Sequence, residues 1–389
     1  MDFGWTPEET AIRVRARQFL DANWSRRGLN GRLDNDRETV HEFERTLAEH
    51  GWLTMAWPSE YGGQSASYMA QMIFKEEATI RGAPNGGMGA AMVGPMLMIH
   101  GSEAQKKEHL PKIASAEVTW CQGFSEPGAG SDLASLQTRA VRDGDEYVIN
   151  GQKIWTSGAQ HADWIHILTR TDPAAPKHRG ISYFLVDMNT PGITVRPLVQ
   201  MHGAAGFNET FYEDVRVPAS NMVGDEHRGW YVATTLLDFE RSGVDRMATT
   251  QNAFEPLLAF ATEAGSAGEG RRIADRQTDR LNLVDTAIEL EVSRLLSYRV
   301  TWMQSNGLVP NYETSISKVH STELLQRNAR RGINALGLHG ALSPDSVHAV
   351  LDGLYCQIYM QTTSRTIGGG TSEIQRNIIA TRGLGLPRG

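Results

Sequence analysis

The chain is poor in the features that define disulfide-stabilised, membrane-spanning and nucleic-acid-binding proteins. Only two of its 389 residues are cysteines, Cys121 and Cys356, which excludes a disulfide framework and a cysteine-based zinc site. No apolar run approaches the roughly 18 residues of a membrane-spanning helix. A net charge of −7 gives no electrostatic reason to bind nucleic acid or an anionic membrane. Because the first residues also lack a leader pattern, we expect a cytoplasmic protein with neither of these partners.

Familiar cofactor and catalytic motifs are missing as well. Gly128-Ala129-Gly130 begins like a dinucleotide-binding loop, but Leu133 occupies the third glycine position and no βαβ pattern surrounds it. The chain has no G-x-S-x-G elbow, and His41-Glu42 lacks the second histidine of a zinc-binding helix. We therefore expect neither a Rossmann domain nor a metal site.

Three regions of the chain differ in the spacing of their apolar residues. Residues 1–117 show helical spacing, residues 118–228 hold short β-branched and aromatic runs between turns, and residues 229–389 return to helical spacing. The sequence thus predicts a mostly α-helical fold with a central β-barrel: an N-terminal helical domain, a β-barrel domain and a C-terminal four-helix bundle. The bundle helices are expected near residues 229–264, 273–305, 312–336 and 344–366.

Local signals add detail to this plan. Asp143, Gly144 and Asp145 predict a tight hairpin turn, and Asn150-Gly151 predicts the start of a second turn. Arginines 13, 15 and 17 follow a helical pattern, and we expect them on a solvated helix face.

Two segments of the predicted β-domain carry the clearest chemical signal. Residues 120–132 are a strand-like run that breaks into a loop rich in proline and glycine, with hydroxyls at Ser125 and Ser131. Residues 151–157 place Trp155 two positions before Ser157. A flavin ring has a flat apolar body with hydrogen-bonding edges, which small hydroxyls, backbone groups and one large aromatic side chain can bind. Together the two segments resemble the flavin-binding strands of the acyl-CoA dehydrogenases.

A third segment, residues 367–376, runs from flexible glycines directly into a predicted helix. Ser372 and Gln375 have the spacing of a capping box at its start. Exposed backbone N–H groups at a helix start suit an anion or the edge of a nucleotide. A plain helix start after a loop has the same pattern, so this segment alone names no ligand.

These segments resemble the acyl-CoA dehydrogenases. The resemblance runs from Thr6-Pro7-Glu8 to residues 367–376, essentially the whole chain. It implies FAD as the cofactor, an acyl-CoA as the substrate and an electron-transfer flavoprotein as the electron acceptor. It also implies the order of N-terminal helices, β-barrel and four-helix bundle.

The resemblance assigns roles to individual residues. It places FAD against Gln122, Phe124, Ser125, Trp155 and Ser157, with Thr371 and Glu373 on the nucleotide side. It places the substrate against Ser131, which meets the CoA arm, and against Asp238, Arg241 and Gly370.

The catalytic base departs from the pattern of the medium- and short-chain members. Those enzymes carry a glutamate at the position of Gly369, and a glycine cannot abstract a proton. Isovaleryl and long-chain members carry the base on a bundle helix instead, and the matching segment, residues 237–241, contains Glu240. A glutamate beside an arginine on a helix is often a solvated pair. Because the alternative position, 369, holds a glycine and no acid, we predict Glu240 as the base.

Two motifs that bind FAD across subunits in the family are altered. The Arg-x-x-Phe-Gly stretch that binds the diphosphate is not recognisable, and Arg272 is the nearest candidate. The Gln-x-x-Gly-Gly-x-Gly loop appears as residues 334–340, where Asn334 and Gly337 remain as FAD-side candidates. These changes argue against a standard homotetramer with four equivalent flavins. They are similar to those of steroid side-chain dehydrogenases, which are heterotetramers, and a homo-oligomer (dimer or tetramer) is the alternative.

The function predicted from the sequence is FAD-dependent α,β-dehydrogenation of an acyl-CoA thioester. Two alternatives stay open. One is a flavin monooxygenase or oxidase of the same fold that acts on a non-CoA substrate, against which Ser131 and the Asp238/Arg241 pair argue. The other is a non-catalytic partner subunit that completes the flavin site of another chain.

Overall fold

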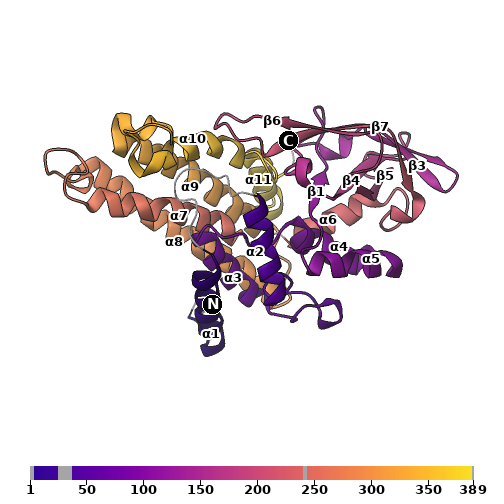
Figure 1. The fold of residues 1–389 in the computed structure, drawn as a ribbon, viewed down its shortest axis with the longest axis horizontal. Coiled ribbons are helices and arrows are strands. Elements are labelled where there is room, and N and C mark those ends of the chain that lie inside the picture. Colours follow the sequence, from indigo (N-terminus) through magenta and orange to yellow (C-terminus); the bar gives the residue numbers. More distant parts are fainter. Residues whose placement is uncertain (1–3, 25–36, 240–242, 388–389) are drawn as a thin grey trace. The chain divides into compact units, whose positions relative to one another are not determined.

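The computed structural model describes residues 4–24, 37–239 and 243–387, with the backbone alone for residues 236–239. The chain divides into two compact units, which Figure 1 colours by sequence. Unit 1 comprises Met1–Phe43, Ala66–Asn85 and Arg241–Gly389, and unit 2 comprises Glu44–Ser65 and Gly86–Glu240.

Unit 2 is built on one seven-stranded sheet. Its strands are β1 (Trp120–Gly123), β2 (Arg139–Asp143), β3 (Glu146–Lys153), β4 (Trp164–Arg170), β5 (Ile181–Asp187), β6 (Ile193–Leu198) and β7 (Phe207–Pro218). They lie in the order β1-β4-β2-β3-β7-β6, and β5 pairs with β4. The parallel β1–β4 pair joins a sheet whose longer pairings are antiparallel. Among the described residues no pairing of β1 with β6 closes the sheet, so the barrel is an open, curled half-barrel.

Turn and bulge residues set the register of this sheet. The predicted hairpin joins β2 to β3 through Gly144 at φ +64°. The predicted turn at Asn150-Gly151 is wrong, because both residues lie inside β3. The register shifts between Ile149 and Gly151, where β7 contains one extra residue. Asn150 binds β7 there, since its Nδ2 donates to Asp214 Oδ1 at 3.0 Å and its Oδ1 accepts from Asp214 N at 2.9 Å.

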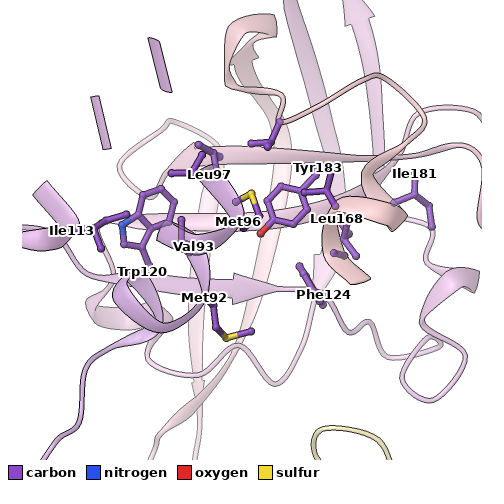
Figure 2. Packing of buried hydrophobic residues seen from close by; sticks show 14 of the residues in the cluster. Met92, Val93, Met96, Leu97, Ile113, Trp120, Phe124, Leu168, Ile181 and Tyr183 are labelled. Atoms are coloured by element: carbon purple, nitrogen blue, oxygen red, sulfur yellow. The ribbon is translucent and has the colours of Figure 1, made fainter. Parts of the chain in front are cut away.

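Three helices of unit 2 pack on the sheet and on one another. They are α4 (Gly94–His100), α5 (Glu103–Ala114) and α6 (Gly229–Phe239). Helix α6 packs against β4 and β5, and α4 packs against α5 and α6. Figure 2 shows the buried cluster that fills this region, where Met92 and Met96 lie near Trp120, Phe124 and Tyr183.

Unit 1 is helical. Its helices are α1 (Pro7–Asn23), α3 (Tyr68–Ile80), α7 (Val244–Thr262), α8 (Gln277–Ser305), α9 (Tyr312–Leu336), α10 (Leu354–Arg365) and α11 (Ser372–Ile378), and α2 (Arg37–Glu49) crosses the boundary between the units. Helix α9 packs against α7, α8 and α10, which together form the predicted bundle. Within the described ranges, no helix combines the length and the apolar character that a membrane crossing requires.

Two of the predicted bundle helices differ from the observed ones. The segment 229–264 forms two helices, α6 and α7, and α6 belongs to unit 2. The last bundle helix begins at Leu354 instead of near residue 344, because a 3-10 turn at Val350–Gly353 precedes it.

The prediction of a solvated arginine face on α1 is wrong for Arg13. Its side chain is 15% exposed, and its Nη2 lies 2.7 Å from Glu76 Oε2 on α3. Arg17 binds the neighbouring Glu77 at 2.9 Å. Burial alone would raise the pKa of Glu77, but hydrogen bonds and charge from Arg17 and Arg13 hold that pKa below its usual value. The cluster joins α1 to α3, which lies about sixty residues further along the chain, so helical spacing alone did not reveal it.

His166 is a fully buried histidine on β4 in the core of unit 2. The Tyr183 hydroxyl lies 2.6 Å from its Nδ1, and Met88 Sδ lies 3.3 Å from its Nε2. Because a thioether sulfur can only accept, Nε2 carries the hydrogen and Nδ1 accepts from Tyr183. These contacts fit a neutral ring, and burial lowers the pKa of His166 to about 3.

His166 should make the stability of unit 2 sensitive to acid. Above pH 6.5, the ordinary pKa of histidine, the ring is neutral in both the folded and unfolded states. As the pH falls from 6.5 toward 3, only the unfolded state takes up the proton. The free energy of unfolding therefore falls by up to about 1.4 kcal/mol per pH unit. We expect His166→Phe to have a shallower dependence of unfolding free energy on pH in this range, measured by chemical denaturation of the apoprotein. The exposed control His348→Phe should keep the wild-type slope, and equal slopes for all three proteins would contradict this assignment.

Candidate active site

The two predicted flavin segments lie side by side in unit 2. The first leaves β1 at Gly123 and continues through Phe124 and Ser125, and the second leaves β3 at Lys153. The backbone N–H of Ile154 donates to the carbonyl of Ser125 at 2.9 Å. The sequence prediction that these segments form one site is therefore consistent with their geometry.

Trp155 stands out in its backbone and in its exposure. Its φ of +62° lies in the left-handed region, which costs a residue with a side chain roughly 1–3 kcal/mol. The neighbouring bonds hold it there, because Ile154 is bonded to Ser125 and Thr156 exchanges backbone bonds with Asn208 at 3.0 and 3.1 Å. The indole is 58% exposed and meets Phe207 edge-on, with ring centroids 6.0 Å apart. A large apolar ring held exposed by a strained backbone is suited to covering a flat ligand.

The predicted polar contacts of the flavin are also accessible to a ligand. Ser157 is exposed, and Ser125 and Gln122 are partly exposed. Phe124 differs from them, because its side chain is 9% exposed and its ring packs edge-on against His166 and Tyr183. Phe124 supports the site mainly from within the core.

The loop that follows Ser125 carries the predicted CoA contact. Ser131 is exposed, and neither Gly128 nor Gly130 has an atom within 4 Å of where a Cβ would stand. Lys177 Nζ binds both oxygens of Asp132 at 2.8 and 3.0 Å, in an ion pair that is exposed to solvent. The loop therefore offers open space and an exposed hydroxyl.

A buried acid–base pair lies under this surface, and the sequence analysis did not identify it. Glu126 Oε1 accepts from Lys153 Nζ at 2.8 Å and from Thr138 N at 2.8 Å, while Oε2 accepts from Gln137 N at 2.6 Å. Lys153 is fully buried and also donates to the carbonyl of Phe124 at 3.1 Å. The available signal was the alternation of β3, in which Lys153 has the same parity as the buried Tyr147 and Ile149.

The pKa values of this pair reflect burial and mutual attraction. Burial is the largest influence on Lys153 and lowers its pKa to about 8, although the charge of Glu126 acts in the opposite direction. For Glu126, burial would raise the pKa, but Lys153 and the hydrogen bonds to Thr138 and Gln137 hold it below its usual value.

The predicted nucleotide-side residues belong to unit 1. Thr371 is the N-cap of α11, where its hydroxyl accepts from Ile374 N at 3.2 Å. The predicted capping box at Ser372 and Gln375 is thus wrong by one residue, and Gln375 Nε2 donates to the carbonyl of Gly369 instead. Glu373 is exposed, and Gly370 takes a φ of +85°.

The remaining candidates are dispersed. Asn334 and Gly337 are exposed at the end of α9, and Arg272 is exposed and binds Asp275 at 2.7 Å. Asp238 lies in the last turn of α6, where only the backbone is described. Glu240 and Arg241 lie outside the described residues.

Comparison with known proteins identifies the family along the whole chain. Residues 6–117 match the N-terminal domain of acyl-CoA dehydrogenases, residues 121–215 the middle domain and residues 227–384 the C-terminal domain. The chain is 38% identical to acyl-CoA dehydrogenase FadE26 of Mycobacterium tuberculosis, over 100% of this chain and 99% of that protein.

Solved structures agree with this assignment. The Tcur3481-Tcur3483 steroid ACAD is 36% identical with a TM-score of 0.90, and the match covers all of both chains. The ChsE4-ChsE5 complex from Mycobacterium tuberculosis is also 36% identical, with a TM-score of 0.88 and the same coverage. On the sequence, the fold and these matches, the chain belongs to the acyl-CoA dehydrogenase family and is an FAD-dependent acyl-CoA dehydrogenase.

Proposed function

We propose that residues 122–125 and 155–157 bind the flavin ring of FAD and that Glu240 removes the α-proton of the acyl-CoA substrate. The observation that carries the flavin assignment is Trp155, whose indole is 58% exposed at a strained φ of +62°. The residues present fit the ring. Trp155 offers an apolar face, the hydroxyls of Ser125 and Ser157 can bond the polar edge, and Gln122 adds an amide.

The reaction removes one hydrogen from each of two adjacent carbons. Glu240 takes the α-proton, for which a carboxylate is a suitable base because it accepts a proton without a further partner. The β-hydrogen leaves with its electron pair, and bound FAD supplies the acceptor. Ser131, Asp238, Arg241 and Gly370 are the proposed contacts that hold the CoA ester in place.

The nucleotide half of FAD is proposed to meet Thr371 and Glu373, with Arg272, Asn334 and Gly337 as the other candidates. The supporting observation is that all five residues are at least partly exposed.

We also retain residues 1–117, 118–228 and 229–389 as the proposed domains, since every strand from β1 to β7 falls within the middle range. An electron-transfer flavoprotein is the proposed acceptor of the electrons. The cytoplasm is the proposed location, because Cys121 and Cys356 are free thiols.

The acyl group is proposed to be a steroid-bearing one. The support is that the 36% identical structure of TM-score 0.90 is a steroid ACAD. Both this structure and the ChsE4-ChsE5 complex are named for two chains, which supports a heterotetramer with a related chain for this protein.

An exposed apolar stripe on α8 gives this assembly a physical basis. Leu281, Val284, Ile288 and Val292 are spaced three or four residues apart, and they are 54%, 49%, 58% and 41% exposed. This spacing places them on one side of the helix. A row of exposed apolar residues is typical of a surface that another chain covers, and we propose a second acyl-CoA dehydrogenase chain as that partner.

Trp155→Ala should weaken FAD binding without destabilising the protein. Loss of an aromatic contact costs about 1 kcal/mol, which corresponds to a roughly fivefold higher Kd for FAD. The unfolding midpoint of the apoprotein should stay unchanged, because the indole is mostly exposed. Titration of apoprotein with FAD, followed by flavin fluorescence, measures the Kd. Tyr68→Ala, which removes another exposed aromatic ring, is the control, and a wild-type Kd for Trp155→Ala would place the flavin elsewhere.

Glu240→Gln should keep FAD bound and slow its reduction by about 10²–10⁴-fold, because the shape remains while the base is lost. Bleaching of the flavin band in stopped flow measures the rate, with the best substrate from a panel of straight-chain and steroid acyl-CoA esters. Glu263→Gln, at an exposed position after α7, is the matched control.

A second variant tests whether side chains at positions 240 and 369 reach the same α-carbon of the substrate. Gly369→Glu in the Glu240→Gln background should restore part of the rate. The position has open space for a side chain, although its φ of +66° adds some strain. If Glu240→Gln alone reduces its flavin at the wild-type rate, Glu240 is not the base, and Glu373 or an acid of the partner becomes the candidate.

Ile288→Glu should disrupt assembly through α8, because it would bury a carboxylate in an apolar contact. Light scattering coupled to gel filtration should show a smaller particle than the wild-type protein, with unchanged circular dichroism. Val14→Glu, at an exposed apolar position on α1, should keep the wild-type mass. An Ile288→Glu particle as large as the wild type would exclude this face.

A further inference from the structure

The ammonium of Lys153 lies where the two proposed flavin segments meet. Lys153 is the last residue of β3 and is fully buried. Its Nζ donates to the carbonyl of Phe124 at 3.1 Å and to Glu126 Oε1 at 2.8 Å. The residue between these two acceptors is Ser125, whose own carbonyl accepts from Ile154 N. Three consecutive residues of one segment are thus bonded to two consecutive residues of the other.

The carboxylate of Glu126 extends this connection to the far end of the loop. Its oxygens accept from the backbone N–H groups of Gln137 and Thr138, at 2.6 and 2.8 Å. The loop that carries Ser131 therefore starts at Glu126, and the carboxylate of the same residue binds the backbone where the loop ends. Because Glu126 is 8% exposed, solvent can replace few of these bonds.

A second buried cation supports the end of this loop. Arg170, the last residue of β4, is 6% exposed and donates to the carbonyl of Leu136 at 3.3 Å and to that of Ala134. Its backbone N–H donates to Thr138 O at 2.7 Å. The loop is thus held by directed bonds on both sides of Ser131.

A buried ion pair is a poor device for stability alone, because desolvation of both charges offsets most of their attraction. What such a pair adds is directional hydrogen bonds, because each bond fixes an angle and a distance that apolar packing does not fix. Here the directed bonds end at Phe124 O and Glu126, on either side of Ser125, and at the Thr138 amide, where the loop that carries Ser131 ends.

We propose that Glu126 and Lys153 are positioning residues for the flavin, which set the spacing between Ser125 and Trp155 and hold the Ser131 loop in its binding form. This inference rests on the proposed flavin site. Neither side chain need touch FAD, because they act through the Phe124 carbonyl and the backbone amides of the loop.

The test compares two variants of the pair with the wild type. Lys153→Met keeps the length of the side chain and removes the ammonium. Glu126→Gln/Lys153→Met removes both charges, so it leaves no unpaired buried charge and should fold even where the single variant is unstable. The measurements are the Kd of apoprotein for FAD, the visible absorption of the bound flavin and the unfolding midpoint of the apoprotein.

A positioning role predicts that FAD binding and stability separate. The double variant should recover most of the unfolding midpoint that Lys153→Met loses, yet its Kd for FAD should stay at least tenfold weaker than that of the wild type, with a shifted flavin band. Lys177→Met, which cuts the exposed pair with Asp132 in the same loop, should change the Kd less than twofold.

The outcomes distinguish this inference from the function on which it rests. A double variant with wild-type Kd and absorption overturns the positioning role, while the flavin site stands if Trp155→Ala still weakens binding. A Kd that returns to the wild-type value together with the unfolding midpoint also overturns it, because the pair would then act only on stability. A wild-type protein that binds no FAD overturns both.

Discussion

The backbone bond between Ile154 and Ser125 is the contact on which the candidate site depends. It joins the ends of β1 and β3, which the chain separates by a loop and a hairpin. Trp155 follows directly after Ile154, so the position of its ring is set by this bond and by the pairing of Thr156 with Asn208. A strained backbone at Trp155 can persist only because its neighbours are fixed on both sides. The exposure of the indole is thus a consequence of sheet geometry.

Features that rest on neighbouring residues could be predicted from the sequence. The hairpin at Gly144 and the strand-rich middle region both follow from local patterns. The turn predicted at Asn150-Gly151 failed for a physical reason. The extra residue that shifts the register lies in β7, and Asn150 bonds Asp214 across the strands instead of turning the chain. No local signal around Asn150 reports on a bulge more than sixty residues away.

The site shows the same division. Ser125, Trp155 and Ser157 were proposed for the site because a known pattern contains them, whereas Glu126 and Lys153, which we propose set their spacing, carry no motif of their own. A charged residue at an inward-facing strand position is the signal that was available at Lys153. The left-handed backbone of Trp155 was not predictable, because a tryptophan gives no local reason to adopt it.

Both units use buried charge to join segments that are distant in the sequence. In unit 1, Glu76 and Glu77 of α3 accept from Arg13 and Arg17 of α1, and Tyr298 of α8 donates to Glu76 at 2.9 Å. In unit 2, Glu126 plays the corresponding part for Lys153. Apolar residues of similar volume would often give equal or greater stability, but they would tolerate a shift of one segment along the other. An enzyme that must hold a flat cofactor against a reacting carbon gains more from fixed spacing than from added stability, because a displacement of about 1 Å at a reacting centre can cost 10²-fold in rate. We therefore interpret the Glu126–Lys153 pair as serving function, because it fixes the spacing of the proposed flavin segments. The Arg13, Arg17, Glu76 and Glu77 cluster fixes α1 against α3 by the same kind of directed bond.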